Sequence, residues 1–328
     1  MLTENDLKLV DALQAGPRAP WSAISTATGM SAVTAARRWQ RLAERRDAWF
    51  AAYPGGGVRK WMTPAFIEVD CVPGKALATA QELADDPNVA SIDHTAGRCD
   101  LLVHVLASTS HGLETYLEHR VAALSSVTAI RTLVSPRILS DGSTWRVRSG
   151  RSGAPGPPTP QFSAPVRFDP LDRALLHALG ADGRAAASTL AAQLNVGETT
   201  VRRRLTALLD SGELVLRCEI ARSLSPAPVT AILWIQVPPG RIDDAGRALT
   251  ALPETRMCAA VNGIANLLLV VWLSSEYQLV TLENVLATAQ PWLSVADRAI
   301  TLRPVKLMGH LLDGEGRPVK YVPLAFPS

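Results

Sequence analysis

The chain contains one pattern twice, and this duplication constrains its fold more than any other feature. Asp6 aligns with Asp172 when the sequence is shifted by 166 residues, and the same shift aligns the two halves of the 328-residue chain almost without gaps. The matched residues occupy apolar, turn and capping positions, among them Leu9 with Leu175, Arg18 with Arg184, Leu42 with Leu208, Pro73-Gly74 with Pro239-Gly240, and Gly97 with Gly263. Two copies of one fold share such positions, so we expect both halves to fold alike.

A linker separates the two copies. Gly, Pro and Ser dominate residues 148–165, which show no hydrophobic period, and this composition is typical of a linker partly stiffened by proline. Each copy then divides into a helical part and a mixed part. The predicted domains are 1–62, 63–145, the linker 146–167, 168–222 and 223–328.

The helical part of each copy predicts a helix-turn-helix. In the second copy, Leu171, Leu175 and Leu179 recur every four residues, and Asp169 is suited to cap that helix. A short helix ends at 195–197, a third helix spans 198–210, and the alternating residues 214–220 predict a strand. The first copy predicts helices over 2–14, 21–28 and 31–46. A short helix, a tight turn and a longer basic helix form the helix-turn-helix plan, here in winged-helix form.

Arginines lie on the outer face of each third helix. Such a helix can enter the major groove while its arginines contact phosphates and guanine edges; the alternative is a solvated charged face. Arg38 and Arg204 precede the inner-face residues Trp39 and Leu205, so they could instead clamp phosphate at the groove edge. The residues predicted to contact double-stranded DNA are Ser31, Thr34, Arg37, Arg38 and Arg41, then Thr199, Thr200, Arg202, Arg203 and Arg204.

The net charge of +3 hides an uneven distribution. Residues 1–62 hold nine Lys or Arg against five Asp or Glu, whereas residues 63–145 hold five against ten. Residues 168–222 balance at seven each. A basic helical part beside an acidic mixed part indicates a nucleic-acid-facing module joined to one with another task. The basic first copy and neutral second copy predict unequal reading of two DNA half-sites.

The mixed part of each copy predicts the order β-α-β-β-α-β. In the first copy we expect strands over 65–72, 89–94, 101–107 and 127–134, with helices over 75–85 and 111–124. In the second we expect strands over 232–237, 256–261, 267–273 and 295–302, with helices over 241–252 and 277–289. This order predicts an α+β chain with two ferredoxin-like (RAM-type) sandwiches, in which helices cover one sheet face. The open face needs a partner, and a second copy is already tethered.

A helix-turn-helix followed by a βαββαβ domain resembles the Lrp/AsnC family of transcriptional regulators. The stretches NDLKLVDALQAGPRAP and LDRALLHALGADGRAA resemble the start of the family's helix-turn-helix. The loops Gly97-Arg98-Cys99-Asp100 and Gly263-Ile264-Ala265-Asn266 are similar to the family's G-x-x-D loop before an apolar strand. The likeness covers nearly the whole chain, twice.

The resemblance implies a transcriptional regulator that binds DNA through its helix-turn-helix domains and a small effector, often an amino acid, between its sandwich domains. It also implies assembly, either as a homo-oligomer or as an intramolecular pseudo-dimer. No cofactor is expected. The implied effector residues are Gly97, Arg98, Asp100, Gly263 and Asn266, with His94 just before the first loop. Glycine lets the backbone approach a ligand, and Asp100 could accept from an ammonium group; alternatively, both residues only form the turn.

Siroheme decarboxylases share this architecture and are the alternative function. They carry a histidine- and arginine-bearing site on the sandwich, and this chain has His94 and His104. The second copy, however, has Ala260 and Val270 at the equivalent positions. A module that only assembles, without binding DNA, is a third possibility that the basic first copy argues against.

Metal binding, secretion and membrane insertion find little support in the sequence. Cys71, Cys99, Cys218 and Cys258 lie far apart without a C-x-x-C pair, so we expect buried thiols, without disulfides or a zinc ribbon. No stretch approaches the roughly 18 apolar residues of a membrane helix. The acidic N-terminal residues do not resemble a signal peptide. We therefore expect a cytoplasmic protein with no membrane partner.

Overall fold

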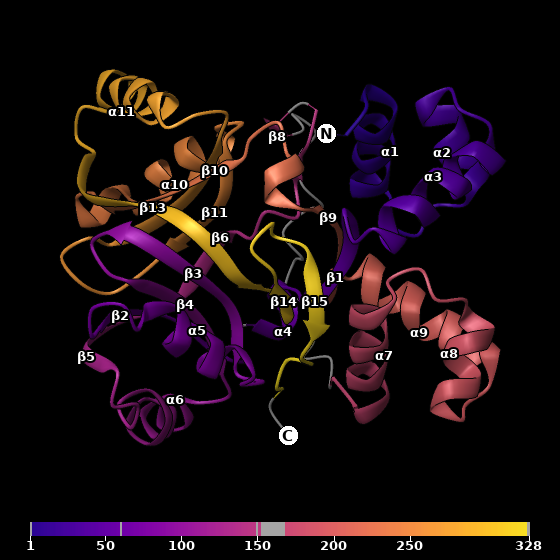
Figure 1. Ribbon diagram of the computed structural model, residues 1–328, viewed down its shortest axis with the longest axis horizontal. Helices are drawn as coiled ribbons and strands as arrows, with labels where there is room; N and C mark the ends of the chain where they lie inside the picture. The colour runs from indigo at the N-terminus through magenta and orange to yellow at the C-terminus, as the bar shows by residue number, and fades with distance from the viewer. Residues whose placement is uncertain (1, 60, 149, 152–167, 327–328) are drawn as a thin grey trace.

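The computed structural model describes residues 2–59, 61–148, 150–151 and 168–326. Most of the predicted linker, 152–167, lies outside these residues. Figure 1 shows two helical units at one end of the molecule and two sandwich domains at the other. Strands β1, β9, β14 and β15 lie between them. The two sequence copies therefore pack with helical unit against helical unit and sandwich domain against sandwich domain.

Each helical unit consists of three helices, as the sequence predicts. Capping boxes begin the first helix of each, with Thr3 and Asp6 in one copy and Asp169 and Asp172 in the other. Gly29 and Asn195, both in the left-handed conformation, end the second helices. The helices are α1 (Glu4–Ala15), α2 (Trp21–Thr28) and α3 (Ala32–Glu44), then α7 (Pro170–Ala181), α8 (Ala187–Leu194) and α9 (Glu198–Asp210).

The two helical units share one strand pair and one core. β1 (Ala48–Pro54) pairs antiparallel with β9 (Leu214–Ile220), so each unit supplies one strand of a two-stranded sheet. All seven residues of β1 are buried. A single apolar cluster includes Leu9 and Leu13 from the first unit and Leu175 and Leu179 from the second. Neither unit could bury this surface alone, because each completes the core of the other.

Two arginines join the helical units reciprocally. Each donates two hydrogen bonds to backbone oxygens in the opposite turn: Arg18 to Gly183 (2.8 Å) and Ala185 (2.9 Å), and Arg184 to Pro17 (2.6 Å) and Ala19 (2.8 Å). Arg184 also lies over the Trp21 ring, 4.2 Å from its centre. These residues are equivalent under the 166-residue shift, so the two units are related by an approximate two-fold axis.

The sandwich domains have the predicted element order. The first contains β2 (Thr63–Cys71), α5 (Ala76–Ala84), β3 (Val89–Gly97), β4 (Leu101–Ala107), α6 (Ser110–Tyr116) and β5 (Val127–Val134), after the short α4 (Gly56–Arg59). The second contains β10 (Val229–Gln236), α10 (Ile242–Ala251), β11 (Thr255–Ala260), β12 (Leu267–Leu273), α11 (Tyr277–Ala289) and β13 (Ser294–Leu307). The helix predicted over 111–124 is α-helical only to Tyr116, continues as a π-helix over Leu117–Val121, and ends there.

The two sheets exchange their last strands. β6 (Arg137–Ser140) follows β5 in the chain but pairs with β11 of the second domain. Reciprocally, β13 extends to Leu307, beyond the predicted end at 302, and pairs with both β10 and β3. The strand order is therefore β5-β2-β4-β3-β13-β10-β12-β11-β6. The two strands at its ends, β5 and β6, follow each other in the chain. This exchange hydrogen-bonds the two domains into one sheet.

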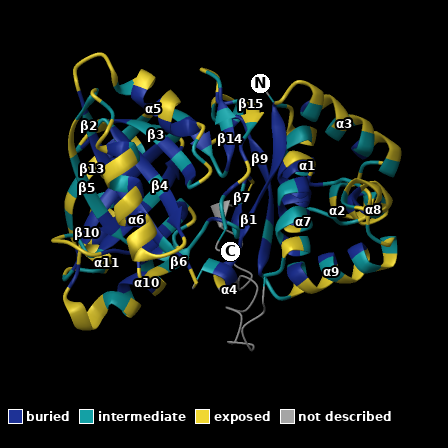
Figure 2. Cartoon of the chain, turned by 90° about the horizontal axis from the view of Figure 1, so that it is seen from below, coloured by how far each residue is buried: buried dark blue, intermediate teal, exposed yellow. Residues whose placement is uncertain are grey.

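The open sheet faces bury each other, as the tethered second copy predicts. Phe66, Leu102 and Leu133 of the first domain pack with Trp234 and Leu268 of the second. Trp234 is only 1% exposed. Figure 2 shows this buried layer between helices whose outer faces are exposed. Because the shared layer is apolar and continuous, the two sandwich domains form one body.

The ends of both copies return to the centre of the molecule. β7 (Trp145–Arg146) pairs with β8 (Gly150–Arg151), and Arg146 bonds to Asp11 of α1, although the sequence places residue 146 in the linker. β14 (His310–Leu312) and β15 (Pro318–Tyr321) form a hairpin on β13. Among the described residues, no helix is long and apolar enough to cross a membrane, and no cluster of His, Cys, Asp or Glu suits a metal ion.

Candidate functional site

The third helix of the first unit presents an exposed basic surface. Arg37 and Arg41 are exposed and lie four residues apart, so they share one helix face. Thr34 is also exposed, at the start of α3. The Ser31 hydroxyl accepts from the Thr34 N–H at 3.1 Å and caps the helix. Helix α3 thus offers two guanidiniums and a hydroxyl to a ligand, with Ser31 fixing the first turn.

Arg38 and Arg204 bind acidic residues within their own helical units. Arg38 Nη1 lies 2.8 Å from Asp6 Oδ1. Arg204 forms ion pairs with Asp169 and, at 3.6 Å, with Asp172. The carboxylates belong to the capping boxes of α1 and α7. Both arginines therefore brace the third helix against the first; the sequence set them apart from their neighbours but did not indicate these ion pairs.

The third helix of the second unit is less basic at its surface. Thr199, Arg202 and Arg203 are exposed, and Thr200 is half-buried. Arg202 donates through Nε to Glu198 at 2.9 Å, within the same helix. The N-cap is Gly197, which offers no side chain where the first unit has Ser31. The equivalent surfaces thus differ in charge and capping, in line with the uneven charge of the sequence.

The two glycine loops lie where the sandwich domains meet. Gly97 has φ +130°, and a Cβ there would lie 2.6 Å from the backbone oxygen of Arg298 in the other domain. Gly263 has φ +121°. His94 pairs in register with Arg303 of β13. Gly97 is therefore required by the close approach of the exchanged strand and by its own conformation.

The polar side chains of these loops make internal contacts. Asp100 Oδ2 accepts from the backbone N–H of Cys71 at 2.7 Å. Asn266, at the equivalent position, accepts from the N–H of Val237 at 3.0 Å and donates to its oxygen at 2.8 Å. Arg98 binds Glu68 at 2.9 Å and Asp297 of the other domain at 3.2 Å. Loop formation thus accounts for these side chains, and their predicted role in effector binding stays a prediction.

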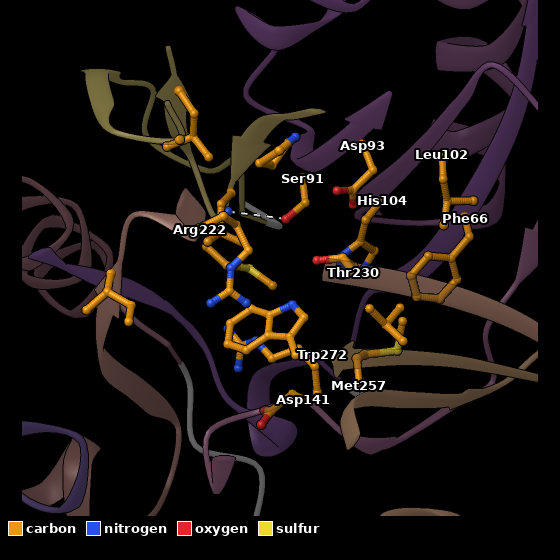
Figure 3. A pocket seen from close by; sticks show the side chains of 18 of the residues that line it. Phe66, Ser91, Asp93, Leu102, His104, Asp141, Arg222, Thr230, Met257 and Trp272 are labelled. Carbon is orange, nitrogen blue, oxygen red and sulfur yellow. Dashed lines mark hydrogen bonds between the residues drawn. The ribbon is translucent and has the colours of Figure 1, made fainter. Parts of the chain in front are cut away.

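A cavity that the sequence did not predict lies between the helical pair and the sandwich domains. Its volume is about 120 Å³, and both copies contribute to its lining. Figure 3 shows Arg222 against Trp272, with His104, Asp93 and Phe66 across the cavity. None of the six predicted effector residues lines it. A signal existed in the sequence: at its lining positions the two copies differ in polarity, as with His104 and Val270.

Buried charges surround this cavity. Arg59 Nη2 lies 2.7 Å from Asp141 Oδ2; burial alone would raise the pKa of Asp141, but Arg59 and Ser143 lower it to about 2. Burial lowers the pKa of His104 to about 3, so its ring is neutral near pH 7. Burial also raises the pKa of Asp93 to about 7, against the opposing charge of Arg222. The cavity therefore combines fixed positive charge with one carboxyl that titrates near neutrality.

Comparisons with known families agree with this architecture. The AsnC-type helix-turn-helix domain matches residues 2–43 and again 168–209, and the Lrp/AsnC ligand binding domain matches residues 64–144. The chain belongs to the Lrp/AsnC family. The resemblance predicted from the two repeated stretches is confirmed, including the second helix-turn-helix.

Transcriptional regulators of three Pyrococcus species are similar to parts of this chain. The chain is 32% identical over 105 residues to an uncharacterised HTH-type transcriptional regulator of Pyrococcus abyssi, covering 31% of this chain and 65% of that protein. A similar regulator of Pyrococcus horikoshii is 30% identical over 32% of this chain and 67% of its own length. The HTH-type transcriptional regulator FL11 of Pyrococcus furiosus is 26% identical over 41% of this chain and 89% of its own length. The first two matches thus span about two thirds of the relatives' lengths.

A similar solved structure spans both copies of this Lrp/AsnC chain. The siroheme decarboxylase NirDL, in complex with an iron-uroporphyrin III analogue, aligns over 97% of this chain and 94% of its own, with a TM-score of 0.59. The sequence identity is 14%. A likeness at this identity concerns the fold, so it supports the packing of the two copies and carries no activity across.

Proposed function

We propose that this chain is a DNA-binding transcriptional regulator of the Lrp/AsnC type that responds to a small-molecule effector. The observation that carries the proposal is the pair of AsnC-type helix-turn-helix units with exposed arginines on their third helices. Exposed guanidiniums on that helix can reach phosphates and guanine edges in the major groove. The names of the Pyrococcus relatives support the same activity.

The pairing of the helical units suggests how the chain would bind DNA. Strands β1 and β9 and the reciprocal bonds of Arg18 and Arg184 hold the two units in one arrangement. A homodimer obtains two half-site readers from two chains, whereas this chain carries both. Because Arg37 and Arg41 are exposed while Arg202 is paired with Glu198, we propose that α3 supplies the larger share of affinity.

The test is selection of bound fragments from genomic DNA, followed by salt-dependent binding to the best fragment. We expect the double variant Arg37→Ala/Arg41→Ala to lower the salt slope by about 1.8, since each phosphate contact contributes about 0.9. Arg247→Ala is the matched control, because Arg247 is 74% exposed but lies on α10 of the sandwich. The proposal would be refuted if no fragment were enriched, or if Arg247→Ala lowered the salt slope as much as the double variant.

The proposed effector is an amino acid or a related metabolite. The match to the Lrp/AsnC ligand binding domain at 64–144 supports this class. The glycine loops, with His94, Gly97, Arg98, Asp100, Gly263 and Asn266, remain the predicted contacts. Repeating the fragment selection with a panel of amino acids would test the effector. If no member of the panel changed the affinity or the selected sequences, this part of the proposal would fail.

A siroheme decarboxylase is the second candidate function, and two observations favour it. The fold is shared over nearly the whole chain, and a cavity holding His104 and Arg222 lies between the two copies. The size of the cavity argues against it: a cavity of about 150 Å³ holds one benzene ring, so 120 Å³ cannot enclose a tetrapyrrole without opening. Incubation with siroheme would decide, because a Soret shift with loss of carboxylates would replace the regulator proposal.

A further inference from the structure

The central cavity lies at the junction of the two copies, where their equivalent residues meet. The 166-residue shift relates His104 to Val270, Ser91 to Met257, and Asp141 to Leu307, and all six line the cavity. In a symmetric homodimer both members of each pair would be identical. Fusion of the copies allows the pairs to differ, and here each contains one polar and one apolar residue. The lining of the cavity is thus chemically asymmetric.

Arg222 supplies an unsatisfied cation to this cavity. Its Nη1 and Nη2 atoms are buried and have no hydrogen-bond partner within the described part of the chain. The guanidinium carbon lies 3.5 Å from the centre of the Trp272 ring, which holds the group in place. The equivalent residue of the first copy is Gly56, so only the second copy contributes this arginine. Buried donors without acceptors cost free energy, which an anionic ligand would recover.

The neighbouring charges add to this positive excess. Glu219, 1% exposed, accepts from Arg217 at 2.7 Å and from Arg256 at 2.6 Å. Arg217 Nη2 and Arg256 Nη1 are nevertheless buried without a hydrogen-bond partner in the described residues. Arg222 therefore lies beside a cluster in which two other arginines share Glu219. A carboxylate can accept two parallel hydrogen bonds from one guanidinium, which makes it a suitable anion.

Apolar side chains form part of the opposite side of the cavity, next to His104 and Asp93. Phe66, Leu102 and Met257 line it, and the Phe66 ring stacks on His104 with centroids 4.7 Å apart. Figure 3 shows these side chains facing Arg222 and Trp272 across the open space. The volume of about 120 Å³ is close to the roughly 150 Å³ that accommodates benzene. The cavity is also partly open, so a single aromatic ring can occupy it while a short acidic arm extends beyond the ring.

We propose that the cavity binds a small aromatic monocarboxylate, with its carboxylate on Arg222 and its ring against Phe66 and Met257. This site is distinct from the predicted glycine loops. Its use as an effector site rests on the proposed regulatory function, whereas the binding itself does not. If the chain bound the aromatic monocarboxylate but recognised no DNA, the inference would stand and the regulator proposal would fail. If it recognised DNA but did not bind this ligand, the regulator proposal would stand and the inference would fail.

Isothermal titration calorimetry on the full chain tests the inference, with phenylacetate as the probe. Phenylacetamide is the matched neutral ligand, and L-phenylalanine tests whether an ammonium group is required. We expect phenylacetate to bind at least tenfold more tightly than either. Phenylacetamide lacks the charge that strengthens hydrogen bonds to Arg222, and the ammonium group of L-phenylalanine would lie among buried guanidiniums that repel it. Tighter binding of L-phenylalanine, or no phenylacetate binding at millimolar concentration, would overturn the proposal.

Two variants locate the site, and a third serves as control. Arg222→Gln should weaken phenylacetate at least tenfold, and Met257→Trp should abolish binding by filling the ring position. Arg298→Gln changes a half-exposed arginine on β13 outside the cavity and should leave the affinity unchanged. Circular dichroism checks that each variant is folded, and if Arg222→Gln is not, Met257→Trp alone decides. Wild-type affinity in folded Met257→Trp would refute this location.

Discussion

The buried carboxylate of Glu219 gives the sharpest test of how the helical pair is joined to the sandwich domains. Glu219 lies on β9, and its partners Arg217 and Arg256 are 2% and 6% exposed. Arg217 also donates to the backbone oxygen of Trp145 at 3.2 Å, which brings in the first copy. Replacing Glu219 with Gln keeps the shape but leaves two guanidiniums buried without their anion. Breaking a buried pair in this way costs about 3–5 kcal/mol.

Urea denaturation at pH 7 measures this cost. The matched control is Glu198→Gln, which breaks the exposed pair with Arg202 on α9 and should cost about 0.5 kcal/mol or less. Burial alone would raise the pKa of Glu219, but Arg217 and Arg256 lower it. Its contribution is therefore fully present above about pH 4.3, the unfolded value, and declines as pH falls through the lower folded pKa.

The wild-type advantage over Glu219→Gln should accordingly narrow under acid conditions. If Glu219→Gln cost less than about 1 kcal/mol at pH 7, or if the difference grew as pH fell, the reasoning would be refuted. Either result would mean that the guanidiniums find other acceptors or water, and that the cluster does not join the two layers.

Three further predictions follow from the described contacts. Trp234→Ala should lower the free energy of unfolding by about 3–5 kcal/mol, because it opens a void in the layer between the two sheets; a urea midpoint unchanged from wild type would contradict this. Arg184→Ala removes two hydrogen bonds and the stacking on Trp21, so we expect a loss of about 1–2 kcal/mol and faster amide exchange in the α1–α2 turn. Phenylacetate affinity should fall as pH rises from 6 to 8, because Asp93 ionises at about pH 7 beside Arg222. Across that interval His104 stays neutral and Asp141 stays ionised, and Arg222, whose pKa burial lowers to about 9, keeps most of its charge, so Asp93→Asn should remove most of the pH dependence.

Sequence periodicity predicted the elements that depend on local contacts. The third helix of the second copy, 198–210, and the following strand, 214–220, have the predicted bounds. These predictions succeed because capping residues, turn residues and apolar spacing act within a few residues of each other. The π-helix at Leu117–Val121 and the extension of β13 to Leu307 were not predicted. Strand β13 gains its extra length by pairing with β3, an interaction between distant segments.

The candidate DNA contacts show the same limit. Arg37 and Arg38 are adjacent and chemically identical, yet one is exposed and the other is held by Asp6, 32 residues away. The predicted effector residues Arg98, Asp100 and Asn266 bind partners across the loop or in the other domain. No local pattern could distinguish these arrangements, because the partners meet only after the helices and sheets have packed.

The sequence by itself determined the duplication, the two helix-turn-helix units, the two βαββαβ sandwiches and the family. Those features follow from repeated short-range patterns of apolar, turn and capping residues. The tertiary structure alone decided which arginines remain available, how the sheets exchange strands, and where a cavity opens between the copies. Arg38 and Arg204 are held within their own helical units, whereas the strand exchange and the cavity depend on residues from both halves, such as Arg222 opposite His104. The physical cause of the exchange and of the cavity is packing across an approximate two-fold axis, which brings together side chains that the linear sequence keeps apart.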